Sequence, residues 1–155
     1  MSSFRTRSDP RLRIVARLNS RPASESMPYF VEIEHDRRRF FVIGRDPVGL
    51  SDVIASLDRQ VEEGAWSYGT IHDSRLVTWM PSREDVIAIV IHIAAIVTAQ
   101  GPRGPVAFIA ASQTLFSIAR MYTAIAEGSK YKASVFRNLE DAQRWLDAAC
   151  AVTSG

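Results

Sequence analysis

The sequence predicts an α/β domain in which a mixed five-stranded sheet is flanked by four helices, in the order ββαβαβαβα. Three observations predict this class. Apolar and polar residues alternate over 29–34, and a second extended run follows a short polar turn, which indicates an antiparallel hairpin. Four later stretches repeat apolar residues at helical spacing. The wholly apolar run 106–111 is typical of a parallel strand covered on both faces.

The N-terminal half of the domain is predicted as a hairpin, a helix and a strand. The hairpin strands are 29–34 and 39–43, and the first of them has one apolar face and one polar face. An amphipathic helix then ends at Gly64. A short strand follows over 67–72, and residues 73–81 are expected to form a loop.

The C-terminal half is predicted largely from helix caps. Ser82, with Asp85 three residues later, forms a capping box that opens a long apolar helix over 83–100. Ser112 caps the next helix, and Asn138 with Asp141 caps the last one. The elements that follow the long helix are strand 106–111, helix 113–128, strand 133–136 and helix 139–149.

The long helix is expected to bury one broad face and to leave a second, unusually apolar face outside. The expected buried face contains Val86, Ile87, Ile89, Val90, Ile93, Ile96 and Val97. In the next helix the residues expected to face inward are Leu115, Ile118, Ala119, Tyr122 and Ile125. An exposed apolar stripe is typical of an interface, so we expect a homodimer through the outer face of the long helix. The residues of this candidate dimer face are Ala88, Ile91, His92 and Ala95.

Composition places the chain among ordinary globular domains. It has 155 residues, 46% of them hydrophobic and 23% charged, with a single cysteine, Cys150. One cysteine excludes an intrachain disulfide, and no apolar run is long enough to span a bilayer. We therefore expect a cytoplasmic protein with one domain, residues 27–149, and a short C-terminal tail, 150–155.

Residues 1–26 form a basic, arginine-rich tail. They hold six arginines against two acidic side chains, whereas the rest of the chain is slightly acidic. No nucleic-acid-binding face is therefore predicted. The tail lacks the apolar segment of a secretory signal peptide. Three alternatives stay open for it: a disordered or artefactual leader before Met27, a short ordered appendage around Leu12–Leu18, and a targeting or anion-binding segment.

No catalytic or metal-binding set can be recognised from residue spacing. His35, His72 and His92 stand alone, without an HExxH or CxxC pattern, so neither a metal nor a cofactor is predicted. His35 is expected in a solvated turn, His72 as a hydrogen-bonded core residue and His92 on the surface. Cys150 has no neighbouring cation in the sequence, and no nucleophile elbow is present. The loop 101–104 precedes a strand rather than a helix, so it is predicted as a rigid connector and not as a phosphate site.

Candidate ligand-binding residues are predicted only from their place in the fold. In open α/β sheets, ligands bind beyond the carboxyl ends of the parallel strands. The polar residues expected there are His72, Asp73, Ser74, Arg75, Ser82, Ser112 and Gln113.

Five segments occur in an order that resembles one known family. They are Ile71-His-Asp-Ser74, the capped apolar helix, Gly101-Pro-Arg-Gly-Pro-Val-Ala-Phe-Ile-Ala-Ala111, Ala119-Arg-Met-Tyr122 and Val135-Phe-Arg-Asn-Leu-Glu-Asp-Ala-Gln-Arg-Trp-Leu146. Together they resemble the SpoIIAA-like branch of the STAS fold, which is named after sulphate transporters and anti-sigma factor antagonists. The resemblance covers residues 27–149. It implies a mixed sheet with helices, no enzymatic activity, and a role as a bacterial binding or switch module.

The resemblance also implies a place for a regulatory serine. Anti-sigma factor antagonists carry a phosphorylatable serine in an Asp-Ser-Ser-Gly-like motif, at the start of the helix after the third strand. The comparable segment here is Trp79-Met-Pro-Ser-Arg-Glu84, which lacks that motif. Ser82 stands at the helix start and is the candidate phosphorylation site. The related fold of the CRAL-TRIO lipid carriers makes a lipophilic ligand an alternative.

Three functions are consistent with these observations. The leading hypothesis is a non-catalytic binding or regulatory module that contacts a protein partner or a second copy. The first alternative is a carrier of a small lipophilic ligand beneath helices 86–97 and 115–125, for which a cavity of about 300 Å³ or more is expected. The second alternative is an enzyme that uses His72, Asp73 and Ser74, with these groups within about 3.2 Å of one another or one water away.

Overall fold

The computed structural model describes residues 29–128 and 131–153, and its elements follow the predicted order ββαβαβαβα. The predicted fold class is confirmed. The strands are β1 (Tyr29–Glu34), β2 (Arg39–Arg45), β3 (Gly69–Leu76), β4 (Val106–Ile109) and β5 (Ala133–Phe136). The helices are α2 (Leu50–Glu62), α3 (Arg83–Gln100), α4 (Gln113–Gly128) and α5 (Leu139–Thr153). The basic tail predicted over 1–26 lies outside the described residues.

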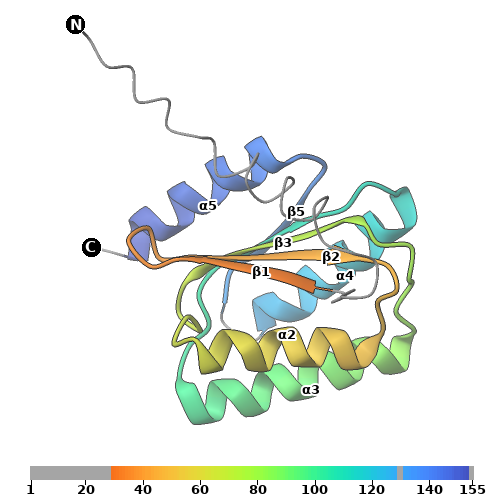
Figure 1. The fold of residues 1–155 in the computed structure, drawn as a ribbon, viewed down its shortest axis with the longest axis horizontal. Helices are drawn as coiled ribbons and strands as arrows, with labels where there is room; N and C mark the ends of the chain where they lie inside the picture. The colour runs from red at the N-terminus through yellow and green to blue at the C-terminus, as the bar shows by residue number, and fades with distance from the viewer. Residues whose placement is uncertain (1–28, 129–130, 154–155) are drawn as a thin grey trace, which may run out of the picture.

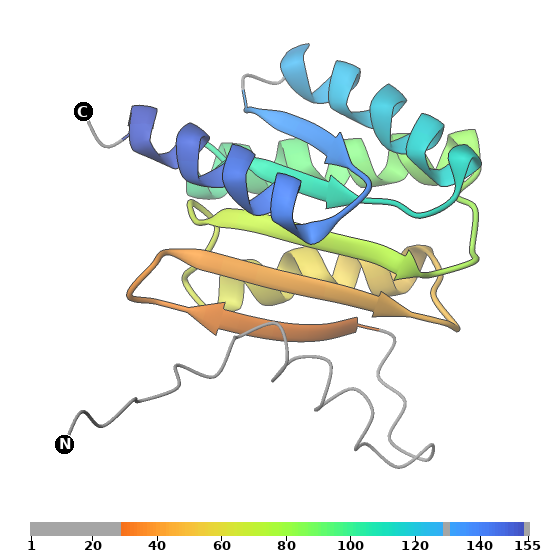
Figure 2. The ribbon, with the colours of Figure 1, turned by 90° about the horizontal axis from the view of Figure 1, so that it is seen from above.

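The five strands form one mixed sheet in sequential order. β1 is antiparallel to β2, and the later pairs are all parallel. Crossovers between parallel strands are right-handed, so three steps in one direction place α2, α3 and α4 on the same face. α5 returns across the opposite face. Figure 1 shows α5 on one side of the sheet and α2 and α3 on the other, and Figure 2 shows β1 at one edge and β5 at the other.

Separate apolar clusters fill the two faces of the sheet. The cluster beneath α2, α3 and α4 contains Leu57, Trp66, Val86, Ile89, Ile93, Ile96, Val106, Tyr122 and Tyr131. The cluster beneath α5 contains Phe41, Ile71, Ala107, Ile109, Ala142 and Leu146. β3 and β4 supply side chains to both faces because successive residues of a strand point to opposite sides.

Some element boundaries differ from the predicted ones. β3 begins at Gly69 and continues to Leu76, so the segment predicted as a loop from residue 73 is partly strand. Its parallel ladder with β2 pairs Ile43 with Asp73. Strand pairing uses backbone hydrogen bonds and does not require apolar side chains. A strand with polar side chains is therefore hard to recognise from its sequence. At the C-terminus, α5 runs to Thr153 and thus past the boundary predicted after residue 149.

Two isoleucines predicted to face inward are exposed. Ile87 of α3 keeps 47% of its surface accessible, and Ile125 of α4 keeps 39%. The buried positions of α3 are Val86, Ile89, Ile93 and Ile96. Because α3 is apolar on almost every side, its composition does not reveal which narrow stripe contacts the sheet. Among the described residues, no helix combines the length and the apolar character needed to cross a membrane.

Candidate ligand-binding pocket

A pocket lies between the sheet and the three helices α2, α3 and α4. Its volume is about 120 Å³. The side chains around it come from β1, β3 and β4, from the segments that follow β3 and β4, from the loop between α3 and β4, and from all three helices. They are Tyr29, Val53, Ser56, Leu57, His72, Ser74, Val77, Trp79, Pro81, Val86, Ile89, Ile93, Arg103, Phe108, Ile109, Ala110, Leu115, Ile118, Ala119 and Tyr122.

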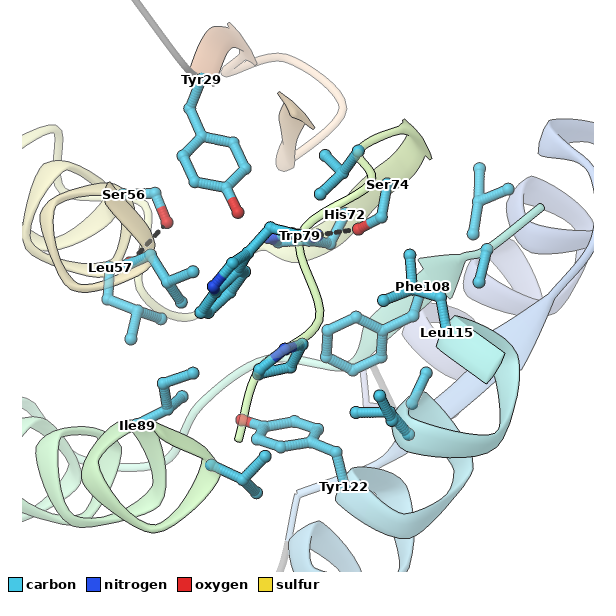
Figure 3. A pocket seen from close by; sticks show the side chains of 18 of the residues that line it. Tyr29, Ser56, Leu57, His72, Ser74, Trp79, Ile89, Phe108, Leu115 and Tyr122 are labelled. Atoms are coloured by element: carbon cyan, nitrogen blue, oxygen red, sulfur yellow. Dashed lines mark hydrogen bonds between the residues drawn. The ribbon is translucent and has the colours of Figure 1, made fainter. Parts of the chain in front are cut away.

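Aromatic side chains form much of the wall. Figure 3 shows Tyr29, Trp79, Phe108 and Tyr122 directed toward a common space, with Ile89 of α3 beside them. The Phe108 and Tyr122 rings meet edge to face, 5.1 Å apart. Such an edge-to-face contact holds both rings in defined orientations. The wall is therefore a packed arrangement and not a set of freely rotating side chains.

The segment that carries Trp79 is tied to the end of β2. The Asp46 carboxylate accepts hydrogen bonds from the backbone N–H of Thr78, at 3.0 and 3.1 Å, and from its hydroxyl group. The hydrogen bonds from Thr78 lower the pKa of Asp46, because they stabilise its charged form. These bonds hold the chain next to Trp79.

His72 of β3 lies in the pocket wall as a neutral side chain. Burial lowers the pKa of His72 to about 4, and the positive charge of Arg103 lowers it further. Its Nδ1 lies 3.2 Å from the hydroxyl oxygen of Ser74, and its ring contacts those of Tyr29 and Phe108. The predicted role of a hydrogen-bonded core histidine is confirmed.

Asp73 does not join His72 and Ser74. It lies between them in β3 and therefore points to the opposite face of the sheet. There its carboxylate accepts three hydrogen bonds from the Arg75 guanidinium, at 2.6, 3.0 and 3.2 Å. Neither Asp73 nor Arg75 lines the pocket. The enzyme alternative needs all three groups close together, and this condition is not met for Asp73, because consecutive residues of a strand point to opposite faces.

Arg103 introduces a positive charge at the pocket. It is 8% exposed, and its guanidinium lies over the rings of Trp66 and Tyr131, at 5.1 and 5.4 Å from their centroids. Nη1 lies 3.5 Å from the Tyr122 hydroxyl, which in turn lies 2.7 Å from the Tyr131 hydroxyl. The buried Nε of Arg103 has no hydrogen-bond partner among the residues that the structure describes. Burial raises the pKa of Tyr122, and the charge of Arg103 offsets only part of this rise.

The loop that carries Arg103 is fastened on both sides. Trp66 Nε1 donates a hydrogen bond of 3.0 Å to the carbonyl of Gly101, and the backbone N–H of Thr70 donates one of 2.8 Å to Pro105. Gly104 packs so closely on the turn before β3 that an added Cβ would lie 2.5 Å from the Ser67 carbonyl oxygen. The prediction of a rigid connector agrees with this structure, but that prediction missed the place of Arg103 at the pocket.

The remaining predicted binding residues lie outside the pocket. Ser82 caps α3, where its hydroxyl accepts the backbone N–H of Asp85 at 3.1 Å, and Ser112 accepts that of Leu115 at 3.1 Å in the first turn of α4. The Gln113 side chain accepts a hydrogen bond from Arg137. Of the seven predicted residues, the structure brings together only His72 and Ser74 at the pocket.

The candidate dimer face is divided between two environments. Ile91 is 64% exposed and Ala95 is exposed, as expected. Ala88 and His92 are half-buried, and His92 Nε2 lies 2.7 Å from the carboxylate of Asp58 on α2. His92 therefore joins α3 to α2, so the apolar surface that remains on α3 is centred on Ile87 and Ile91.

Cys150 also differs from its expected surroundings. It is a partly buried cysteine of α5, and Nη1 of Arg39 lies 3.1 Å from its sulphur. A cation therefore lies beside Cys150. The sequence had suggested none, because Arg39 is distant from Cys150 along the chain. The same arginine forms an ion pair with Asp147 at 2.6 Å.

The carrier hypothesis named the space beneath helices 86–97 and 115–125, and both helices line the pocket. The wall residues from the strands and loops were mostly missed because they carry no common motif. Tyr29, Phe108 and Tyr122 have the pattern of ordinary core residues. One indication was available for Tyr122, because a hydroxyl group on an inward helix face needs a buried partner. Nothing in the sequence indicates that Arg103, in a Gly-Pro loop, turns inward.

The described residues contain no group of three or more His, Cys, Asp or Glu side chains that could hold a metal ion. No family model, curated protein or solved structure matched this chain in the comparisons. The pocket itself is thus the main basis for a functional proposal.

Proposed function

We propose that this domain is a non-catalytic module that binds a small, largely apolar ligand in the pocket beneath α2, α3 and α4. The observation that carries the proposal is a cavity of about 120 Å³ with mainly aliphatic and aromatic walls. Ligand sites are typically concave and apolar, with a few polar groups that fix orientation. Here His72, Ser74 and Arg103 are such groups.

The volume limits the ligand to a small one. It is below the 300 Å³ expected for a lipid carrier, so a long-chain lipid does not fit. An apolar cavity of about 150 Å³ binds benzene, so a ligand built around one ring or a short branched chain suits this pocket. The lipophilic-carrier hypothesis is thus retained for small ligands only.

The chemistry of the wall supports binding rather than catalysis. A general base works best when its pKa is near the working pH, whereas His72 has a pKa of about 4 and no carboxylate to orient it. Resemblance to the SpoIIAA-like branch of the STAS fold supports the same class of function. In this proposal the chain is a cytoplasmic bacterial module that responds to a small molecule.

The pocket can be tested with ring-sized probes and a pair of alanine variants on one helix. We expect toluene and p-cresol to cause saturable NMR shifts at amides around the pocket of the wild type. Ala119 lines the pocket, whereas Ala124 of the same helix is exposed. Ala119→Leu should abolish the shifts by filling the space, and Ala124→Leu should preserve them. An absence of saturable shifts in the wild type at millimolar probe would refute the proposal.

A second candidate function is protein binding through α3. Ile87 and Ile91 expose 47% and 64% of their surfaces on this helix. These two residues are one helical turn apart and so share a face, and exposed apolar side chains that share a face are typical of an interface. It favours the protein-interaction hypothesis, with a second copy of the chain as the simplest partner.

A further inference from the structure

The charge balance of the pocket narrows the chemistry of its ligand. Among the described residues that line it, Arg103 is the only one with a positively charged side chain, and none is an aspartate or glutamate. Arginine stays protonated in proteins. The pocket therefore carries one positive charge and no opposing carboxylate.

Arg103 is also incompletely satisfied. A buried charge is costly unless it is paired and hydrogen-bonded. No ion pair of Arg103 occurs among the described residues, where each ion pair joins other side chains. Stacking on Trp66 and Tyr131 provides part of the compensation. The hydrogen bond from Nη1 to the Tyr122 hydroxyl is long, at 3.5 Å, and no described residue accepts a hydrogen bond from Nε.

From this combination we infer that the pocket binds a small apolar monocarboxylic acid, with its carboxylate paired to Arg103 and its apolar part against the aromatic and aliphatic wall. The inference rests on the proposed function and adds the class of ligand. A guanidinium group matches the two oxygens of a carboxylate. A phosphate dianion fits less well, because a single buried cation would leave one of its charges unpaired.

The loop around Arg103 supports a built site. The hydrogen bonds of Trp66 and Thr70 to this loop fix its backbone, and the contacts of the guanidinium with the Trp66 and Tyr131 rings restrain its orientation. A side chain held in this way loses little further freedom when a ligand binds. The position of Arg103 is therefore set before any carboxylate arrives.

The decisive experiment compares acids with their neutral amides of nearly the same shape. Binding of benzoate, benzamide, isovalerate and isovaleramide to the full chain is measured by calorimetry at pH 7. We expect the wild type to bind at least one acid ten or more times more tightly than its amide. Arg103→Met should remove this preference, whereas Arg120→Met, at an exposed position of α4, should keep it.

Each outcome separates the inference from the proposed function. Equal binding of an acid and its amide by the wild type would overturn the inference and leave a pocket for neutral ligands. If none of the four probes binds, the inference is overturned. If toluene and p-cresol also fail to bind, the proposed function is refuted as well. If Arg103→Met does not fold, the comparison of acid and amide in the wild type still decides the question.

Discussion

The side-chain amide of Gln60 donates a hydrogen bond of 2.9 Å to the hydroxyl oxygen of Thr70 and thereby joins α2 to β3. The same nitrogen donates a second bond of 2.9 Å to the carbonyl oxygen of Ala65. Gln60 and Thr70 are each only 1% exposed. Water cannot replace these bonds when they are removed, so this buried contact should matter for stability.

Gln60→Met should lower the free energy of unfolding by about 1–3 kcal/mol, because it removes the donor to the buried Thr70 hydroxyl oxygen and one of two donors to the Ala65 carbonyl oxygen, which keeps the backbone N–H of Tyr68. Urea unfolding followed by circular dichroism measures this loss. Gln100→Met, at an exposed position of α3, is the control and should change stability by no more than about 0.5 kcal/mol. A double-mutant cycle with Thr70→Val that shows no coupling would contradict this role.

Gly104→Ala should destabilise the fold more than Gly44→Ala does. At Gly104 the added Cβ meets the backbone carbonyls of Ser67 and Tyr68, which cannot move without disrupting the turn. At Gly44 the nearest atoms are side-chain carbons of Val77 and Tyr29, at 2.6 and 2.9 Å, which can rotate.

We expect a loss of about 3 kcal/mol for Gly104→Ala and about 1–2 kcal/mol for Gly44→Ala, from the range measured for overpacking. Thermal and urea unfolding of both variants provide the comparison. Equal losses would show that the loop around Gly104 can shift freely.

Stability should fall as the pH is lowered through the range in which His72 titrates in the unfolded chain. The pKa of His72 is about 4 in the folded protein and 6.5 for an unperturbed side chain. Between these values the unfolded chain binds a proton that the folded protein does not bind. The stability due to the neutral histidine is therefore complete above about pH 6.5 and is lost progressively toward pH 4.

His72→Gln isolates this effect, because the other titrating groups are unchanged. Between pH 7 and pH 4 the wild type should lose up to about 3 kcal/mol more than the variant loses. Urea unfolding of both proteins across this range gives the two slopes. Parallel slopes would mean that His72 has the same pKa in the folded and unfolded states.

Ser82→Ala should cost about 0.5–2 kcal/mol, the usual effect of losing an N-cap side chain. The capping box is complete in the structure, since the Asp85 carboxylate also accepts the backbone N–H of Ser82 at 2.9 Å. Ser82→Asp should fold with nearly wild-type stability, because aspartate also caps helices and its charge suits the helix N-terminus. If Ser82 is a switch, this variant should also bind partners differently from the wild type. Equal stability of wild type and Ser82→Ala would contradict the cap.

The exposed face of α3 should mediate self-association. Ile91→Glu should convert a dimer into a monomer, because it places a charge in the apolar surface beside Ile87. Ala55→Glu, at an exposed position of α2, is the matched control and should leave the dimer intact. Light scattering of the three proteins at high micromolar concentration measures this difference. A monomeric wild type would exclude the dimer.

The predicted buried face of α3 shows which features of a helix can be predicted from sequence patterns and which cannot. The capping box at Ser82 is local, so the start of this helix was predicted correctly at Arg83. The direction in which Ile87 points depends on where the sheet lies, and the nearly uniform apolar composition of α3 does not indicate it. Asp73 shows the same limit, because ladder pairing with Ile43 extended β3 through polar residues.

The sequence by itself determined the order of strands and helices and the mixed character of the sheet. Residue periodicity, caps and turns act within a few positions of the chain, so they can be recognised without a structure. Tertiary packing alone decided the pocket. Arg103 contacts Trp66 before β3, Tyr122 in α4 and Tyr131 before β5, and these residues are far from it in the sequence. The burial that lowers the pKa of His72 likewise exists only once the helices cover the sheet.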